Sequence, residues 1–333
     1  MDARLKKLVD QALAGRIIET NEIRYLFDVP LFSEESFYVQ WAGRKMSDEC
    51  SGGVAEIHGQ VGVNSGPCAC NCAFCSFAKS NGVFTEQFTE PMEQIIDKCV
   101  TLQNQGVNAI YLMATAAFSF TDYLEIARMV KMNLDRDIPM IANVGDFNYQ
   151  MALALKQVGF TGIYHAVRMG EGRVTRIDPQ KRQASLAAAR KAGLILGTCV
   201  EPVGPEHTLD ELVEKTVITR EVNPVFSGAM RRINIPDTEL NEHGMISEAR
   251  MAHILAVVRL SMGYSIPGNC THEPNVVGAQ SGANLLWAEA GANPRDIVQE
   301  TEVSRGFDML KCFNVLKEAE WQVLKGPSHF FTR

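Results

Sequence analysis

NSGPCACNCAFCSFAKSNG, residues 64–82, holds four of the nine cysteines of the chain. Cys68, Cys72 and Cys75 follow the spacing C-x3-C-x2-C, and Cys70 lies between the first two. Three thiolates at this spacing can hold one face of a cubic iron–sulfur cluster, which normally takes four cysteine ligands. With three ligands, one iron stays open to another molecule. The stretch therefore predicts an iron–sulfur centre with an open coordination position.

A structural zinc site is the first alternative for this loop. Such a site is closed by four ligands, usually as two C-x2-C or C-x2-H pairs. No histidine pair with that spacing follows the loop, and the remaining cysteines stand isolated in the sequence. A zinc finger is therefore disfavoured. The isolated cysteines are Cys50, Cys99, Cys199, Cys270 and Cys312.

Charge and composition exclude several further classes of protein. The 333 residues include 32 Lys and Arg against 39 Asp and Glu, a net charge of −7 without a basic run, so a nucleic-acid partner is disfavoured. The start, MDARLKKL, is charged and lacks an apolar signal core. No apolar stretch reaches the ~18 to 20 residues of a membrane span. Cysteines without a secretion signal indicate a reducing compartment, and we expect the cytoplasm.

From residue 54 onward, apolar runs that predict strands alternate with amphipathic runs that predict helices. This alternation predicts parallel strands with right-handed crossovers, and about eight units suffice for a closed (β/α)8 TIM-type barrel. An open doubly wound sheet is the alternative, but no G-x-G-x-x-G motif follows a strand. We expect a helical extension over 1–50 and a barrel domain over 51–333 that ends in a helix. Strands are predicted at 54–63, 108–114, 138–144, 161–167, 194–200, 225–235, 264–267 and 283–288, and helices at 2–14, 20–29, 34–48, 91–105, 121–133, 148–158, 180–192, 208–222, 246–262 and 304–324.

Catalytic groups of such barrels gather at the carboxyl ends of the strands. The first predicted strand delivers the cysteine loop there. The other strands deliver Met113, Ala114 and Thr115; Asn143 and Asp146; Arg168, Arg173 and Arg176; Cys199, Glu201 and the turn 202–206; Arg231, Arg232 and Asn234; Asn269, Cys270, His272 and Glu273; and Trp287 and Glu289.

Several of these residues have a purely structural alternative. Asn143 and Asp146 are equally suited to cap the next helix. His165, in the middle of a strand, is more typical of a buried core histidine. Cys199 and Cys270, with Cys50 or Cys70, are candidates for a second iron–sulfur cluster or a sulfur source, although isolated cysteines are usually just buried. These alternatives remain open at the level of sequence.

The cysteine loop resembles the signature of the radical S-adenosylmethionine (SAM) enzymes, in which an aromatic residue, here Phe74, precedes the third cysteine. Three later stretches, 190–206, 231–240 and 281–287, resemble one branch of that superfamily. The branch includes biotin synthase, the HydE-like hydrogenase-maturation enzymes and methylornithine synthase. The resemblance covers residues 50 to 300.

The resemblance implies a set of roles. Cys68, Cys72 and Cys75 would bind a [4Fe–4S] cluster whose open iron chelates the amino and carboxylate groups of SAM. Arg176 would bind the SAM carboxylate. The other residues implied in SAM binding are Phe74, Val203 and Gly204 at the adenine, Ala114 and Thr115 at the methionyl ammonium, and Asn143 and Arg168 at the same strand ends.

The resemblance also implies the chemistry. Reductive cleavage of SAM gives a 5′-deoxyadenosyl radical that takes a hydrogen atom from a small-molecule or carrier-bound substrate. The electron comes from a donor of the flavodoxin or ferredoxin type. Arg231, Arg232, Arg168 and His272 suggest an anionic substrate, because guanidinium groups bind carboxylates in pairs. We expect Arg232, Cys199 and Cys270 to be catalytic.

Three outcomes stay open for the function, which we expect to lie in cofactor biosynthesis. One is sulfur insertion fed by a second cluster at Cys199 and Cys270. Another is rearrangement or fragmentation, which needs no second cluster. A non-enzyme alternative is an iron–sulfur carrier or assembly scaffold, although carriers are usually small.

Overall fold

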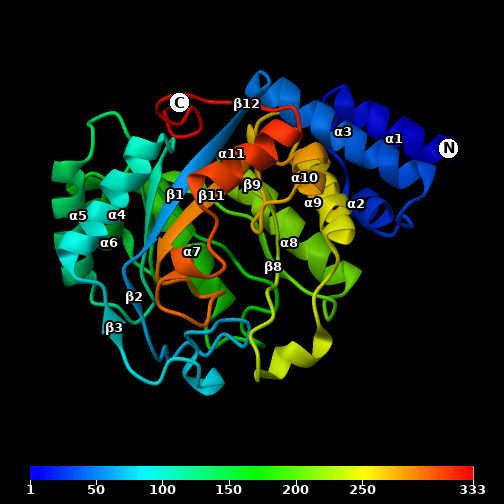
Figure 1. Cartoon of the computed structure of the whole chain (residues 1–333). Coiled ribbons are helices and arrows are strands. Elements are labelled where there is room, and N and C mark those ends of the chain that lie inside the picture. Colours follow the sequence, from blue (N-terminus) through cyan, green and yellow to red (C-terminus); the bar gives the residue numbers. More distant parts are fainter. Residues whose placement is uncertain (333) are drawn as a thin grey trace.

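Eight parallel strands close into a barrel, as the alternation of strands and helices predicts (Figure 1). The computed structural model describes residues 1–332. Its main sheet has ten strands, of which β8 (Val200–Val203) and β12 (Gln322–Val323) each pair with a single neighbour, which leaves eight in the ring. The ring closes because β10 pairs with β9 and β11, and β11 pairs with β1. The barrel strands are β1 (Val54–Gly62), β4 (Ile110–Met113), β5 (Met140–Asn143), β6 (Gly162–Tyr164), β7 (Ile195–Gly197), β9 (Phe226–Arg231), β10 (Gly268–Cys270) and β11 (Leu285–Gly291).

Helices surround the barrel, and local capping residues set their ends (Figure 1). Thr208 and Glu211 form a capping box that satisfies the first N–H groups of α8. Gly106, at φ +97°, ends α4 in the left-handed conformation that glycine adopts without a steric penalty. The surrounding helices are α4 (Met92–Gln105), α5 (Phe120–Asn133), α6 (Tyr149–Val158), α7 (Pro179–Lys191), α8 (Leu209–Val222), α9 (Glu248–Met262), α10 (Val276–Gln280) and α11 (Met309–Glu318).

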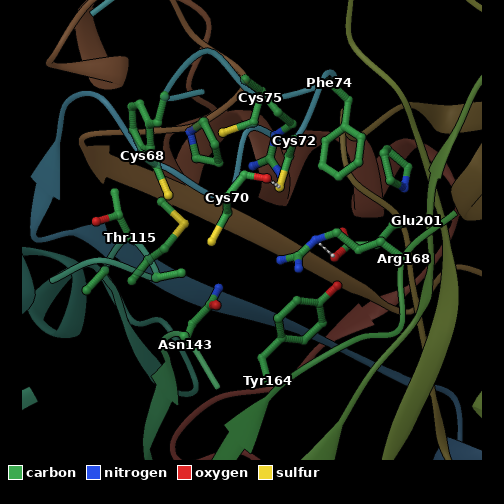
Figure 2. Close-up of a pocket in the computed structure, with 18 of the residues that line it drawn as sticks. Cys68, Cys70, Cys72, Phe74, Cys75, Thr115, Asn143, Tyr164, Arg168 and Glu201 are labelled. Atoms are coloured by element: carbon green, nitrogen blue, oxygen red, sulfur yellow. Dashed lines mark hydrogen bonds and ion pairs between the residues drawn. The ribbon is translucent and has the colours of Figure 1, made fainter. Parts of the chain in front are cut away.

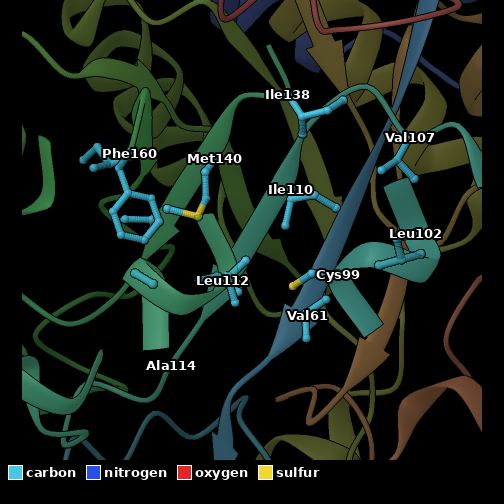
Figure 3. Close-up of a cluster of buried hydrophobic side chains, with 14 of the residues drawn as sticks. Val61, Cys99, Leu102, Val107, Ile110, Leu112, Ala114, Ile138, Met140 and Phe160 are labelled. Atoms are coloured by element: carbon cyan, nitrogen blue, oxygen red, sulfur yellow. The ribbon is translucent and has the colours of Figure 1, made fainter. Parts of the chain in front are cut away.

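The main core lies between the outer face of the barrel and this helical layer (Figure 3). Ile110 and Leu112 on β4 point outward to this core, whereas Tyr111 between them points into the barrel, as the two-residue period of a strand requires. Cys99 on α4 is fully buried in the same core. It is therefore a small core residue, as is the buried Cys312 on α11.

Three N-terminal helices, α1 (Ala3–Leu13), α2 (Thr20–Phe27) and α3 (Glu34–Ser51), pack against α8 and α9. A Cβ atom at Gly43 would lie 2.9 Å from Ala256 Cβ, so α3 approaches α9 as closely as backbones allow. Buried His253 on α9 contacts Ser36 Oγ at 3.0 Å and the Leu26 carbonyl at 2.9 Å. The extension thus shares a core with the barrel helices, and it carries none of the cavity residues described below.

Two predicted elements are placed wrongly. The strand expected at 264–267 lies at 268–270, because α9 ends at Met262 and the buried Arg259 guanidinium binds the carbonyls of Gly263 and Ile266 in the turn that follows. The helix expected at 304–324 is shorter. Asp308 caps α11 at its start, and beyond the end of α11 the chain adds β12 to β1. The sequence also did not predict the hairpin of β2 (Asn64–Ser65) and β3 (Phe88–Thr89), the short α10, or the 3₁₀ turns η1 (Lys79–Asn81), η2 (Glu239–His243) and η3 (Thr301–Val303).

The C-terminal segment closes the amino end of the barrel. Phe330 and Phe331 are 2% and 1% exposed. The Glu56 carboxylate at the start of β1 accepts hydrogen bonds from the backbone N–H groups of His329 and Phe330, at 2.8 and 3.2 Å. A Cβ atom on Gly162 would lie 2.6 Å from the Phe331 ring, so glycine is required there. Within residues 1–332, no helix combines the length and apolar character of a membrane span.

Candidate active site

A cavity of about 160 Å³ opens at the carboxyl ends of the strands and reaches into the barrel (Figure 2). The cysteine loop after β2 covers one side of it, and side chains inside the barrel form its floor. The ends of most barrel strands, and the adjoining strand β8, contribute residues to its wall. These include Ala114 and Thr115 after β4, Asn143 on β5, Arg168 after β6, Glu201 on β8, Arg231 on β9 and His272 after β10.

Internal hydrogen bonds fold the cysteine loop back on itself. The Cys68 N–H donates to the Phe77 carbonyl at 2.7 Å, and the Lys79 N–H donates to the Cys68 carbonyl at 3.1 Å. The Asn81 side-chain amide donates to the Cys75 carbonyl at 2.8 Å. These bonds replace the regular ladder that a strand or helix would offer, so the segment between β2 and η1 has a defined shape.

Two distant segments hold the loop against the barrel. The Ala73 N–H donates to the Val174 carbonyl at 2.8 Å, in the segment between β6 and α7. The Ser76 N–H donates to the Pro294 carbonyl at 2.9 Å, in the segment after β11. The loop is therefore positioned by the fold and by residues far away in the sequence.

The three thiols of the C-x3-C-x2-C motif all line the cavity, together with Cys70. A hydrogen bond from the Cys70 thiol lowers the pKa of Cys68 to about 6. Burial raises the pKa of Cys72 to about 11 and that of Cys75 to about 12. Metal ligation requires thiolates, so binding of iron at Cys72 and Cys75 would release protons.

The arrangement of these thiols fits a cluster better than a single ion. Among residues 1–332, no three His, Cys, Asp or Glu side chains converge on one point as a mononuclear site requires. In a [4Fe–4S] cluster each thiolate binds a different iron, so its ligands surround the cluster and do not meet. Cys68, Cys72 and Cys75 around one cavity match that requirement.

Two arginines lie on the wall nearest to Cys72. Arg168 Nε lies 3.6 Å from the Glu201 carboxylate, and Arg182 Nε lies 3.6 Å from that of Glu171. Burial opposes the charge of Arg168, but Glu201 and Glu171 hold its pKa above the ordinary value. Burial, and then the charge of Arg168, lower the pKa of Arg182. Arginine keeps its proton in proteins, so this wall presents two guanidinium groups.

His165 belongs to the support of this wall. It is 3% exposed, and its Nε2 lies 3.0 Å from Asp146 Oδ1 and 3.2 Å from Arg182 Nη1. Burial lowers the pKa of His165 to about 4, so the ring is neutral at physiological pH. The interpretation of His165 as a core histidine is confirmed. Asp146 does not cap the next helix, because Asn148 does so.

The opposite wall carries a buried charge network. His272 Nε2 lies 3.2 Å from the Glu289 carboxylate, and Arg295 binds both residues. Burial favours the neutral form of Glu289, yet His272 and Arg295 lower its pKa to about 2. Beside this network, Arg231 pairs with Glu273 at 3.3 Å. This wall therefore offers guanidinium groups whose charges are already balanced by carboxylates.

Aromatic rings form the floor of the cavity. Tyr111, Tyr164 and Trp287 project into the barrel from β4, β6 and β11, and all three line the cavity. Trp287 stacks on His272 with a centroid distance of 5.5 Å. Below these rings lie the phenylalanines of the C-terminal segment. The deeper end of the cavity is thus lined mostly by aromatic rings, with polar atoms at the edges of the rings.

Several predicted SAM-binding residues lie together on the cavity. Phe74, Ala114, Thr115, Asn143 and Arg168 all line it (Figure 2). The Thr115 N–H is held by Asn64 Oδ1 at 2.9 Å, which fixes the backbone after β4. Their roles remain predictions, but the fold brings all five to one place.

The prediction for Arg232 is wrong. Its guanidinium is 1% exposed, does not line the cavity, and binds the Glu206 carboxylate at 2.7 and 3.1 Å. It also donates to the Gly244 carbonyl. Arg232 therefore stabilises the turn between β9 and α9, whereas Arg231 lines the cavity.

Arg176, Val203 and Gly204 also lie away from the cavity lining. Arg176 is exposed, and it supports the cysteine loop through its backbone N–H. Val203 is buried against the helical layer, and Gly204 lies beside the Glu206 carboxylate. The part of that segment that does line the cavity is Glu201 and Pro202.

Cys199 and Cys270 meet inside the barrel, but outside the lining of the cavity. Both are at most 1% exposed, and the Tyr164 hydroxyl lies 2.8 Å from Cys199 Sγ. Cys50 lies at the other end of the barrel, on the last turn of α3. The fold therefore does not assemble Cys50 with this pair.

Sequence reasoning missed several cavity residues. Arg182 lies in the first turn of α7, a position that a sequence pattern assigns only to a helix. Gln60, Tyr111 and Tyr164 were hidden in strand interiors, where alternation could have identified them as facing inward. Arg295 follows β11, the last strand of the barrel, by four residues, and no pattern marks it.

Comparison with known proteins relates part of this chain to a family. Residues 66–217, which include the four cysteines of the loop and the strands from β3 to β8, match the radical SAM superfamily. This part of the chain is similar to that superfamily. No curated protein sequence matches it.

Solved structures share this barrel fold over nearly the whole chain. The FeFe-hydrogenase maturase HydG from Carboxydothermus hydrogenoformans has a TM-score of 0.82 and 16% identity, covering 99% of this chain and 81% of HydG. Methylornithine synthase (PylB) has a TM-score of 0.74 and 17% identity, covering 97% of this chain and 98% of PylB. At these identities the likeness shows the shared fold.

Proposed function

We propose that this chain is a radical SAM enzyme that binds a [4Fe–4S] cluster through Cys68, Cys72 and Cys75 and acts on a small substrate held inside the barrel. The observation that carries the proposal is that the three thiols line the same cavity as the charged walls and the aromatic floor. When bound, the cluster and SAM would supply a 5′-deoxyadenosyl radical that takes a hydrogen atom from the substrate.

Residues of the chain would position SAM and protect the reaction. Arg182, a buried guanidinium on the cavity wall, is better placed for the SAM carboxylate than the exposed Arg176. Phe74 remains the candidate for the adenine. Tyr111, Tyr164 and Trp287 would keep water away from the reacting atoms, which limits side reactions of a radical.

We infer a polar substrate that carries a carboxylate. Arg231 and Arg295 line the cavity, and a guanidinium can bind a carboxylate through two hydrogen bonds. Each already pairs with a carboxylate of the protein, so a substrate with both a positive and a negative group would fit this wall. Cofactor biosynthesis is our expected setting, in a reducing compartment and with a small electron-transfer protein as the donor.

Rearrangement or fragmentation is our preferred outcome over sulfur insertion. Cys199 and Cys270 pack with Tyr164 below the cavity, and no third ligand joins them in the described part of the chain. A carrier or scaffold role is less well supported, because such a role does not need a substrate-sized cavity beside the cluster.

The test is anaerobic reconstitution followed by reduction with dithionite in the presence of SAM. We expect about four irons per chain and release of 5′-deoxyadenosine. The C68A/C72A/C75A variant should lose both, whereas C50A, which removes a thiol far from the cavity, should keep both. More than four irons, with some kept in the triple variant, would support a second cluster. Iron without SAM cleavage would favour a carrier.

A further inference from the structure

Cys70 has no role in the three-ligand arrangement, yet it lines the same cavity as Cys68, Cys72 and Cys75. Its side chain is half-buried there. In Figure 2 its sulfur points away from the loop and toward the side of the cavity where Asn143 and Arg168 lie. Cys70 is therefore directed toward the side of the cavity that carries Asn143 and Arg168, two residues expected to bind SAM.

The backbone of the loop holds Cys70 in this direction. Its carbonyl accepts a hydrogen bond from the Arg176 N–H at 2.7 Å. The next residue, Asn71, has φ +44°, in the left-handed region that asparagine tolerates better than most residues. The Asn71 side chain accepts a hydrogen bond from the Ser80 N–H at 3.1 Å, which supports this turn. The inward direction of Cys70 is thus built into the loop.

We propose that Cys70 is a fourth, exchangeable ligand that closes the open iron when SAM is absent and leaves it when SAM binds. The proposal rests on the function proposed above. Cys70 binds the iron as a thiolate. On exchange, its sulfur–iron bond breaks, and the amino and carboxylate groups of SAM bind in its place. The SAM ammonium loses one proton when its nitrogen binds the iron, and the released thiolate takes up one proton through water, so the exchange is balanced in protons. No electron is transferred in this step.

Such an exchange has two physical consequences. A thiolate at the open iron completes the four-cysteine set that these clusters normally have. Water and oxidants then find no open coordination position on the iron. SAM must then compete with Cys70. If nine molecules in ten are closed, the apparent affinity for SAM is about tenfold weaker than that of the open site.

The first experiment compares wild type, C70A and C50A after anaerobic reconstitution. Electron paramagnetic resonance of the reduced cluster should give C70A a signal different from that of wild type without SAM. With SAM the three proteins should give the same signal. C70A should bind SAM about tenfold more tightly than wild type, and C50A should bind it equally. Identical spectra without SAM and equal SAM affinity in C70A and wild type would overturn the proposal.

The second experiment uses the wild type alone, so it does not depend on folding of a variant. The oxidised, reconstituted protein is treated with iodoacetamide, without reductant, and the modified cysteines are identified by mass spectrometry. We expect Cys70 to be protected without SAM and modified after SAM is added. Modification without SAM, and protection with it, would contradict the proposal. If the wild type binds about four irons but Cys70 is modified without SAM and protected with it, only the proposed ligand exchange is refuted. If the wild type binds no iron, the proposed function itself is refuted.

Discussion

At the scale of single residues, Arg232 and Glu206 form a buried ion pair with two short contacts. Removing one partner of such a pair leaves the other charge buried without compensation. We therefore expect R232A to lower the free energy of unfolding by about 3 kcal/mol. Chemical denaturation of the iron-free protein measures this change.

The matched control for R232A is the double variant R232M/E206Q, in which neither charge remains. It should recover much of the lost stability, because an uncharged pair has no desolvation penalty to offset. An R232A protein that is as stable as wild type would show that the pair contributes little.

Because His253 is buried, we expect the free energy of unfolding to depend on pH. Burial lowers its folded pKa to about 4, against about 6.5 in an unfolded chain. The unfolded state therefore binds the proton more tightly, and stability falls as the pH drops from about 6.5 to about 4. The full effect is roughly 3 kcal/mol. His165, whose pKa burial also lowers to about 4, adds a loss in the same range.

Unfolding of the iron-free protein at several pH values tests this prediction. H253Q keeps an amide in place of the ring but cannot titrate, so its stability should fall less steeply between pH 6.5 and 4. Equal slopes in H253Q and wild type would mean that other groups cause the acid sensitivity.

The arginines show what sequence can and cannot predict about a site. Along β9, Phe226 and Met230 face into the barrel, so alternation would also point Arg232 inward. The strand ends at Arg231, so its alternation does not continue to Arg232. As a result Arg231 lines the cavity and Arg232 does not. Arg176 was predicted at the cavity but lies outside it, since no periodicity predicts side-chain direction in a loop. The cysteines were predicted to share one site because of their spacing, and all four line the cavity.

At the scale of elements, the cysteine loop depends on only a few hydrogen bonds, to segments around Val174 and Pro294. A bound cluster would cross-link the loop, because ligand binding to the folded state stabilises it. We expect limited proteolysis of iron-free protein to cut first within 66–82, and the reconstituted protein to resist cleavage there. The C68A/C72A/C75A variant should be cut equally with and without iron. First cleavage elsewhere in both forms would show that iron does not order the loop.

The C-terminal segment is a second element with a testable role. Phe331 is 1% exposed and packs on Phe226 and His58. F331A would leave a cavity at the base of the barrel and should cost about 3 to 5 kcal/mol in unfolding free energy. F37A makes the same side-chain change on α3, where the ring is 58% exposed, and should cost less than about 1 kcal/mol. Equal losses in F331A and F37A would contradict the role of Phe331 in closing the barrel.

The bounds of helices could be predicted from the sequence where a periodic apolar pattern continues over several turns. Long amphipathic helices such as α4 and α8 lie within two residues of their predicted bounds, because caps and glycines mark their ends. The segment after residue 300 was not predictable. Its order comes from contacts distant in sequence, such as the hydrogen bond from the Trp321 ring to the Ala279 carbonyl.

At the scale of the whole molecule, the barrel is sealed at its amino end and covered by the cysteine loop at the other. The aromatic floor and Phe330 and Phe331 close the lower side of the cavity. A molecule bound on the floor would therefore pass the same rim as the SAM proposed to bind there. Whichever of these two molecules binds deeper would have to enter first and leave last. A product formed on the floor would stay trapped until methionine and 5′-deoxyadenosine have departed, so the sealed base of the barrel would set the sequence of release.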